Sequence, residues 1–219
     1  MAYDLTDKIA LVTGASRGLG FAVAEALAER GAHVIALART VGALEELDDR
    51  IKAKGGSATL APIDLTKDEA VAGICRAIYD RWGRIDVLVH TAVHAPSLSP
   101  ADHAAAKDFT KTFATNAEAT LRVIRMVAPL LQAAKNGRAV FCDDPCDGDK
   151  FFALYGASKA AARAMVQSWA AETARTGPNV SLFTPNPMPT ATRARFFPGE
   201  DRSGLASPDE EAARLLDTL

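Results

Sequence analysis

The sequence predicts one α/β domain in which helices cover both faces of a parallel sheet. Short apolar runs alternate along the chain with longer stretches of helical periodicity, which is the pattern of strand–helix–strand units. A length of 219 residues and an apolar share of 48% suit one domain with a substantial core. A glycine-rich turn, Thr-Gly-Ala-Ser-Arg-Gly-Leu-Gly at residues 13–20, joins the first apolar run to the first helical pattern.

Each expected strand is an apolar run, and glycines mark the ends of the helices between them. We expect strands at residues 9–12, 33–38, 57–61, 86–89, 138–142 and 179–184. We expect helices at residues 18–30, 41–54, 67–82, 101–115, 116–134, 155–176 and 208–216. No internal repeat or linker stands out, so residues 1–219 are expected to form a single domain.

The glycine-rich turn has the features of a phosphate cradle. Glycines let the backbone bend and approach a pyrophosphate, and the free N–H groups at a helix start attract its charge. The spacing is G-x-x-x-G-x-G, which is neither the commoner G-x-G-x-x-G nor a Walker loop, and an ordinary turn is the alternative. The residues expected to contact the cofactor here are Gly14, Ser16, Arg17, Gly18, Leu19 and Gly20.

Two further positions bear on the choice of dinucleotide. Arg39 follows the second strand, where an acidic residue would bind the ribose of NAD and an arginine accommodates the 2′-phosphate of NADP. With Arg17 it favours NADP over NAD, although both could be solvated surface arginines. Asp64, beside Leu65 after the third strand, could meet the adenine amine or cap the helix that starts near Lys67.

Tyr155 and Lys159 stand at positions i and i+4 and therefore share one helix face. A nearby ammonium favours the phenolate and lowers the pKa of a tyrosine from its usual value of about 10. Such a tyrosine can exchange a proton with an alcohol or carbonyl oxygen while hydride moves to or from nicotinamide. A surface pair is the alternative for this motif alone.

Together, the glycine turn at residues 13–20, the Y-x-x-x-K motif and the alternating α/β pattern resemble the short-chain dehydrogenase/reductase family from about residue 5 onward. The resemblance implies a Rossmann-type doubly wound sheet that binds NAD or NADP and an activity that interconverts alcohols and carbonyls. It implies that Tyr155 is the acid/base and that Lys159 holds the ribose and tunes the tyrosine. Asn116 would anchor a proton-relay water, with a helix cap as the alternative.

The resemblance also assigns residues beside the cofactor and a substrate lid. Ala92, Pro185 and Thr190 match family positions along the cofactor, and Thr190 would face the nicotinamide side. The segment 186–207 corresponds to the lid. Its Arg193 and Arg195 could grip an anionic group or could simply be solvated.

The sequence departs from the family at the serine that donates a hydrogen bond to the substrate oxygen. Alignment from residues 137–140 puts Asp144 at this position, whereas counting back from Tyr155 by the family's spacing lands on Cys142. An ionised carboxylate cannot donate a hydrogen bond, and it repels a developing alkoxide. Val93 replaces a glycine that passes the cofactor. We expect the loop at residues 143–149 to be a polar surface turn.

A further departure is that the family's seventh strand is missing. We therefore expect a three-layer α/β/α domain with strand order 3-2-1-4-5-6, in which residues 179–184 form an edge strand. The family resemblance implies a homodimer through the helices at residues 116–134 and 155–176.

Charge and composition limit the classes of binding partner and the cellular location that we expect for the protein. A net charge of −2 gives no electrostatic case for nucleic acid or an anionic membrane, and no apolar run approaches the ~20 residues of a membrane span. The N-terminus lacks the pattern of a secretory signal, and the three cysteines favour a reducing cytoplasm. We expect no metal site, since the spacing of His90, His94 and His103 does not match a known ligand motif.

The sequence therefore predicts an NADP-dependent oxidoreductase acting on a small carbonyl or alcohol. The alternative is a nucleotide-binding or interaction protein that kept the fold but lost efficient turnover because Asp144 occupies the serine position.

Overall fold

In the computed structural model of the chain, which describes residues 4–219, the apolar runs pair into one parallel sheet. The strands are β1 (Ile9–Thr13), β2 (His33–Ala38), β3 (Ser57–Pro62), β4 (Val87–His90), β5 (Arg138–Cys142) and β6 (Asn179–Phe183). Their order is β3-β2-β1-β4-β5-β6, which confirms the predicted doubly wound topology and leaves β6 at an edge. Residues 1–3, part of the stretch in which we expect no secretory signal, lie outside the described residues.

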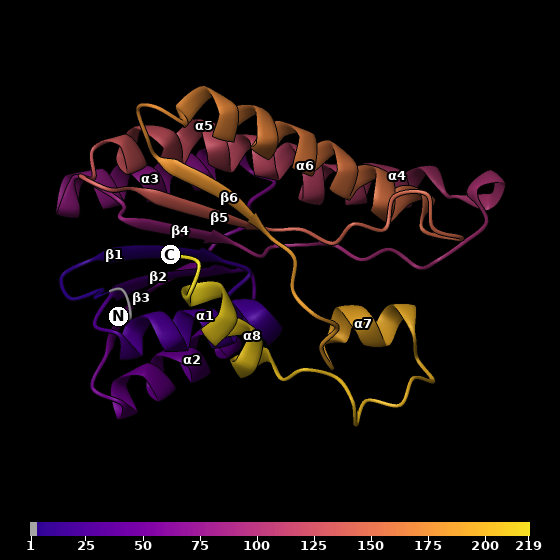
Figure 1. The fold of residues 1–219 in the computed structure, drawn as a ribbon, viewed down its shortest axis with the longest axis horizontal. Coiled ribbons are helices and arrows are strands. Elements are labelled where there is room, and N and C mark those ends of the chain that lie inside the picture. The colour runs from indigo at the N-terminus through magenta and orange to yellow at the C-terminus, as the bar shows by residue number, and fades with distance from the viewer. Residues whose placement is uncertain (1–3) are drawn as a thin grey trace.

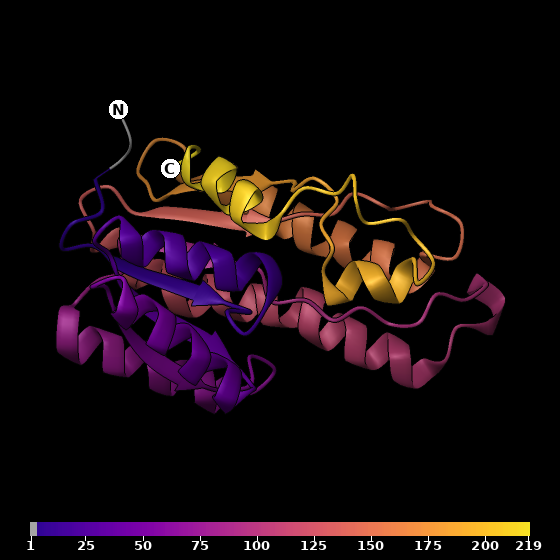
Figure 2. The same cartoon turned by 90° about the horizontal axis from the view of Figure 1, so that it is seen from below.

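Helices cover both faces of this sheet, as predicted (Figure 1). One layer holds α1 (Gly18–Glu29), α2 (Val41–Ala53) and α8 (Pro208–Leu216), and the other holds α3 (Asp68–Trp82), α5 (Ala119–Gln132) and α6 (Ala153–Thr173). Beyond the carboxyl ends of the strands lie α4 (Ala106–Phe113) and the short α7 (Ala191–Phe196), on opposite sides of the sheet (Figures 1 and 2). None of the helices in residues 4–219 has the length and apolar character needed to cross a bilayer.

The apolar runs are buried on both faces because side chains along a strand alternate between the two layers. Ala10 and Val12 of β1 belong to the core cluster beneath α1 and α2. Ile9 and Leu11 belong to the cluster on the opposite face, with α3 and α5. The sheet thus separates two apolar cores, and polar side chains suited to binding or catalysis are found at the ends of the strands.

The predicted boundary between helices at residues 115 and 116 is wrong. A short 3₁₀ turn, Ala101–His103, precedes α4, which then continues through a π-helical segment, Ala114–Glu118, into α5. Asn116 lies inside this continuous helix and is buried, so it does not cap a helix. A single π-helical turn is often found at functional sites, where it re-aims a side chain.

The lid segment contains α7, which the sequence did not predict. Its six residues are too few to show helical periodicity, and its start is fixed by Thr190, whose Oγ1 accepts a hydrogen bond from Arg193 N at 3.3 Å. The segment is anchored at Asn186, whose backbone N and Nδ2 both donate to the buried carboxylate of Glu211 on α8, at 2.9 and 2.8 Å.

Replacing Glu211 by alanine is expected to lower the free energy of unfolding by about 1–3 kcal/mol, because Asn186 N–H would lose its partner. Burial raises the pKa of Glu211, but hydrogen bonds from Arg214 and Asn186 outweigh it and leave the pKa below its ordinary value. The stabilisation is therefore present above the unfolded pKa of about 4.3 and is lost as the pH falls through the lower folded value. Urea titrations at pH 7 and below pH 4 measure this, with the exposed Asp209→Ala as control.

Candidate functional site

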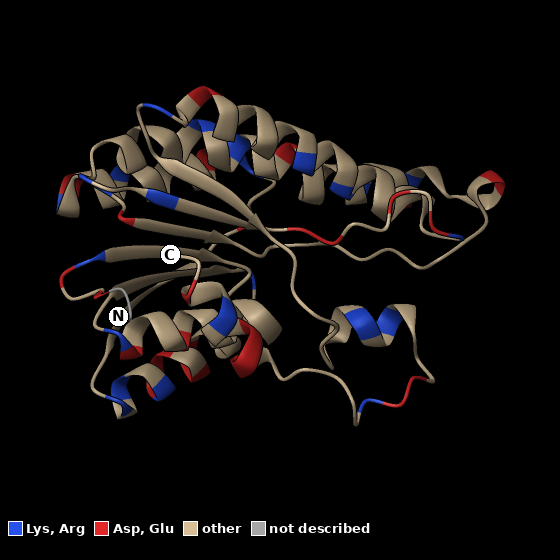
Figure 3. Ribbon diagram, viewed as in Figure 1, with Lys and Arg blue, Asp and Glu red and all other residues tan. Residues whose placement is uncertain are grey.

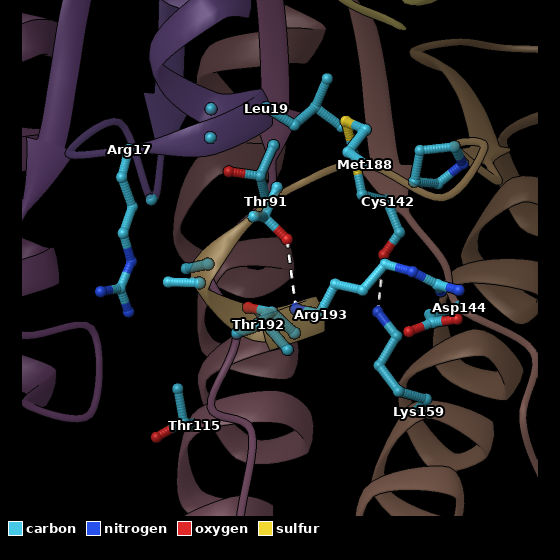
Figure 4. Close-up of a pocket in the computed structure, with 18 of the residues that line it drawn as sticks. Arg17, Leu19, Thr91, Thr115, Cys142, Asp144, Lys159, Met188, Thr192 and Arg193 are labelled. Atoms are coloured by element: carbon cyan, nitrogen blue, oxygen red, sulfur yellow. Dashed lines mark hydrogen bonds between the residues drawn. The ribbon is translucent and has the colours of Figure 1, made fainter. Parts of the chain in front are cut away.

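A cavity of about 420 Å³ opens at the carboxyl ends of the strands, between the glycine turn, the loop after β5 and the lid segment (Figure 4). This is the edge of a doubly wound sheet where ligands bind, since the strand order reverses there. Every residue expected to contact the cofactor lines this cavity: Gly14, Ser16, Arg17, Gly18, Leu19, Gly20, Arg39, Asp64, Leu65, Ala92, Tyr155, Lys159, Pro185 and Thr190. Asp144 lines it as well.

The glycine turn leaves the start of α1 open. Arg17 stands at the N-cap, and its side chain forms no capping hydrogen bond with the first-turn amides. Gly14 has φ +73°, and a Cβ there would lie 2.7 Å from Thr91 Oγ1 and 2.8 Å from Ala92 N. A Cβ on Gly20 would overlap the carbonyl oxygen of Gly14. Uncapped amides beside a turn too close-packed for side chains fit a pyrophosphate.

At the end of the cavity beside the loops that follow β1, β2 and β3, Arg17 and Arg39 are exposed and line the wall. Asp64 Oδ1 accepts hydrogen bonds from Thr66 N and Thr66 Oγ1, both at 2.9 Å. The N-cap of α3 is Lys67 and receives no side-chain hydrogen bond. The interpretation of Asp64 as the cap of this helix is therefore wrong, and its carboxylate closes a turn at the cavity wall instead.

At the opposite end, Tyr155 and Lys159 project from α6 beside the loop after β5. Tyr155 is only 3% exposed, and its hydroxyl donates a hydrogen bond to Asp144 Oδ2 at 2.9 Å. Lys159 Nζ donates to the carbonyl oxygen of Cys142 at 2.7 Å, and Figure 4 shows Lys159 and Asp144 across the cavity from Arg17.

The expected lowering of the tyrosine pKa is wrong in this structure. Burial raises the pKa of Tyr155, and the carboxylate of Asp144 raises it further by charge repulsion and by holding the phenolic proton. Burial also lowers the pKa of Lys159. The tyrosine therefore retains its proton well beyond neutral pH.

Asn116 lines a smaller cavity of about 20 Å³ behind Lys159, and not the large one. Its Oδ1 accepts from His94 N at 2.7 Å, and its Nδ2 donates to His94 O at 3.0 Å and to Ser158 Oγ at 2.9 Å. These contacts fix the loop after β4 against α6.

His90 is a buried structural side chain. Its Nδ1 lies 2.8 Å from Thr13 Oγ1 and its Nε2 lies 3.1 Å from Thr120 Oγ1. Burial lowers the pKa of His90 to about 3, with a smaller contribution from Lys159, so the ring is neutral. Within residues 4–219 no three histidine, cysteine, aspartate or glutamate side chains are grouped to hold a metal ion.

The loop at residues 143–149 is only partly the polar surface turn that we expected. Asp143 and Cys146 are buried, because the loop folds back into the cavity wall. Asp143 forms an ion pair with Arg163 of α6 at 3.1 Å, and its backbone N donates to Phe183 O. This anchoring holds the neighbouring Asp144 beside Tyr155.

An aromatic wall that the sequence did not predict closes this end of the cavity. It consists of Phe152, Phe196 and Phe197, all of which line the cavity. The ring of Phe196, on α7, is 4.8 Å from that of Tyr155 and 5.0 Å from that of Phe152. In the sequence, this wall is indicated only by two Phe-Phe pairs, at residues 151–152 and 196–197, which lie outside the segments with helical or strand periodicity. The sequence does not show in which direction the side chains of either pair point.

The lid carries one charged side chain into this wall. Arg193 binds Glu200 through Nε at 2.6 Å and Nη2 at 2.5 Å, and its guanidinium lies 4.6 Å from the centre of the Phe197 ring. Arg193 is thus paired, whereas Arg195 is exposed and does not line the cavity.

The parallel strand order, with an open helix start at the strand switch point, defines a Rossmann-type α/β fold. The sequence matches the family model described as short chain dehydrogenase over residues 8–201, and the chain belongs to this family. An uncharacterized oxidoreductase of Staphylococcus epidermidis is 30% identical, over 84% of this chain and 79% of the relative. One from Listeria monocytogenes is 32% identical, over 82% and 73%.

Solved structures of the same family superimpose closely on the chain. A short chain dehydrogenase from Shigella flexneri complexed with NADP has a TM-score of 0.90 at 28% identity, over 97% of this chain and 91% of the other. One from Escherichia coli complexed with NADPH has the same values. A metagenomic short-chain oxidoreductase in complex with NADP has a TM-score of 0.83 at 30% identity, over 97% and 90%.

Proposed function

We propose that the protein is an NADP-dependent oxidoreductase that transfers hydride between nicotinamide and a small carbonyl or alcohol. The observation that carries this proposal is that the uncapped start of α1 and the Tyr155–Lys159 pair line one continuous cavity. The cavity extends from the start of α1, which is suited to bind a phosphate, to Tyr155, which carries a proton. A bound dinucleotide and its substrate require a cavity of this extent.

The preference for NADP is supported by Arg17 and Arg39. Both guanidinium groups line the adenosine end, and neither forms a salt bridge within residues 4–219. An unpaired guanidinium is suited to bidentate binding of a phosphate. The family members from Shigella flexneri and Escherichia coli whose structures hold NADP or NADPH agree with this choice.

Replacing Arg39 by alanine is expected to weaken NADPH binding by about ten- to hundredfold and to leave NADH binding nearly unchanged. A charge-assisted hydrogen bond to a phosphate is worth about 1.5–3 kcal/mol, and only NADPH carries the 2′-phosphate. Fluorescence titration of both dinucleotides measures the two constants. Arg76→Ala removes an exposed arginine paired with Asp80 and serves as the charge control. An equal loss for both dinucleotides would contradict the assignment.

The chain's own residues would share the chemistry as follows. The first-turn amides of α1 bind the pyrophosphate, and Lys159 holds the ribose on the nicotinamide side. The bound dinucleotide supplies or accepts the hydride. In reduction Tyr155 gives a proton to the substrate oxygen, so that one hydride and one proton convert the carbonyl to an alcohol. Asn116 holds the loop after β4 against the helix that carries both side chains.

A second candidate function is supported by the contact between Tyr155 and Asp144. Because the phenolic proton is donated to a carboxylate, it is not free to stabilise a developing alkoxide. A protein with this arrangement would bind the nucleotide and turn over carbonyls slowly.

Fluorescence titration with NADPH and NADH, followed by NADPH oxidation with a panel of carbonyls, separates the two functions. Tight binding with measurable turnover supports the oxidoreductase. Tight binding without turnover, in a protein whose turnover is not increased by Asp144→Ser, supports the nucleotide-binding protein that has lost efficient catalysis. A protein that binds neither dinucleotide would contradict both.

We further propose a homodimer formed through α5 and α6, located in the cytoplasm. Leu121 of α5 and Ala164 of α6 are exposed on these helices, where they are available for contact with a second copy. Light scattering after size-exclusion chromatography measures the assembly, and a monomer at micromolar concentration would contradict it.

A further inference from the structure

At the end of the cavity around Tyr155, the Asp144 carboxylate accepts hydrogen bonds, and the phenol and one N–H of Lys159 already have acceptors. Tyr155 already donates to Asp144 Oδ2, and Lys159 already donates to the Cys142 carbonyl oxygen. A substrate oxygen that becomes an alkoxide here would meet the carboxylate of Asp144 and would be repelled. A substrate nitrogen that carries a proton and a positive charge would find an acceptor in the same place.

The surrounding groups also suit a cation. Phe152, Phe196 and Phe197 line this part of the wall, and aromatic rings attract cations to their faces. The guanidinium of Arg193 already lies 4.6 Å from the Phe197 ring centre, so one ring of this wall carries a cation in the structure. The aromatic wall and the Asp144 carboxylate thus both favour a positively charged ligand.

The charges at this end favour a cation once the internal ion pairs are taken into account. Asp143 is neutralised by Arg163, and Arg193 by Glu200. Asp144 and Asp149 line the cavity, and neither forms a salt bridge within residues 4–219. Figure 3 shows acidic residues on the loop between β5 and α6 and basic residues on α7. The buried ammonium of Lys159 is the one unpaired cation of this wall in the described part of the chain.

We propose that the preferred substrate is a small iminium ion, a protonated carbon–nitrogen double bond, with the Asp144 carboxylate as the partner of its N–H group. This inference rests on the proposed NADP-dependent hydride transfer and replaces the carbonyl by a cationic electrophile. Asp144 Oδ2 exchanges the Tyr155 hydroxyl for the iminium N–H and keeps the nitrogen protonated.

The reaction balances without a proton from the protein. Hydride adds to the iminium carbon and forms a C–H bond, while the π bond breaks and its electron pair becomes the lone pair of the nitrogen. The substrate gains two electrons, NADPH is the reductant, and the positive charge of the substrate is cancelled by the hydride. A neutral amine leaves the site. Tyr155 therefore keeps its proton throughout, which suits a buried phenol whose pKa is raised.

The test compares 2-methyl-1-pyrroline, a cyclic imine that is readily protonated, with cyclopentanone, a neutral ketone of similar size. The readout is NADPH oxidation by the full chain. We expect kcat/KM for the imine to exceed that for the ketone at least about tenfold. Asp144→Asn is expected to lower the imine value by about ten- to hundredfold, because it removes a charge-assisted hydrogen bond, and not to lower the ketone value.

Two variants sharpen the comparison. Tyr155→Phe is expected to abolish ketone reduction and so to raise the ratio of imine to ketone reduction, since only the ketone needs the phenolic proton. Asp102→Asn removes an exposed aspartate of the 3₁₀ turn that does not line the cavity, and it is expected to change neither rate.

The outcomes separate this inference from the proposed function. A protein that binds no NADPH contradicts the proposed function and the inference with it. A protein that binds NADPH and prefers the ketone, or that fails to reduce the imine when saturated with NADPH, overturns the inference alone. An imine rate that is unaffected by Asp144→Asn, at unchanged NADPH affinity, also overturns it.

Discussion

Asp144→Ser is expected to raise kcat/KM for ketone reduction by about 10²–10³, the usual worth of one hydrogen-bond donor to a developing oxyanion. The substitution does two things at once. It supplies a hydroxyl that can donate to the substrate oxygen, and it removes the carboxylate that now accepts the Tyr155 proton at 2.9 Å. The phenol is then free to protonate the substrate.

The pH profile of the same variant reports on the tyrosine. As a proton donor, Tyr155 must be protonated, so reduction slows as the pH rises through its pKa. Burial and the Asp144 carboxylate raise this pKa in the native protein. Removal of the carboxylate lowers it, and the alkaline limb of the variant should appear at lower pH than that of the native protein.

Asp144→Ala is the matched control, since it removes the carboxylate without supplying a donor. We expect it to show the shifted alkaline limb and only a small part of the rate increase. The difference between the serine and alanine variants then measures the donor itself. Equal ketone rates for the native protein and both variants would show that Asp144 does not limit carbonyl reduction.

The parts of this site that the sequence predicts are those fixed by local patterns. The glycine turn lies between β1 and α1 because apolar periodicity changes there from strand to helix, and the residues around it line the cavity as expected. The strand order follows from the same alternation and from the family resemblance. In each case the residues that carry the signal are neighbours in the chain.

The features that the sequence does not predict depend on contacts between distant segments. Nothing near Tyr155 in the sequence shows that its hydroxyl meets Asp144 instead of approaching Lys159. The direction of Phe196 is set by packing of α7 against the start of α6, two segments that are separated by the whole of β6. The buried position of Asp143 likewise depends on its ion pair with Arg163, which lies in the following helix, α6.

Gly20→Ala is expected to weaken NADPH binding by about ten- to hundredfold and to lower Tm by several degrees. The added Cβ would overlap the carbonyl oxygen of Gly14 and Thr91 Oγ1. Displacing either atom is unfavourable, because the Gly14 oxygen belongs to the backbone and Thr91 Oγ1 donates a hydrogen bond to Thr13 O at 2.7 Å. The start of α1 must therefore separate from the glycine turn, at a cost of about 1–3 kcal/mol.

The same displacement moves the uncapped amides that are proposed to bind the pyrophosphate, so stability and affinity should fall together. Gly42→Ala tests whether this follows from the clash or from the loss of a glycine, since a Cβ at Gly42 in α2 meets nothing within 4 Å. It is expected to leave NADPH binding unchanged and to stabilise the protein by up to about 1 kcal/mol through helix propensity. Thermal unfolding with and without NADPH measures both effects. A Gly20→Ala protein that is destabilised but binds NADPH normally would show that the dinucleotide does not depend on this helix start.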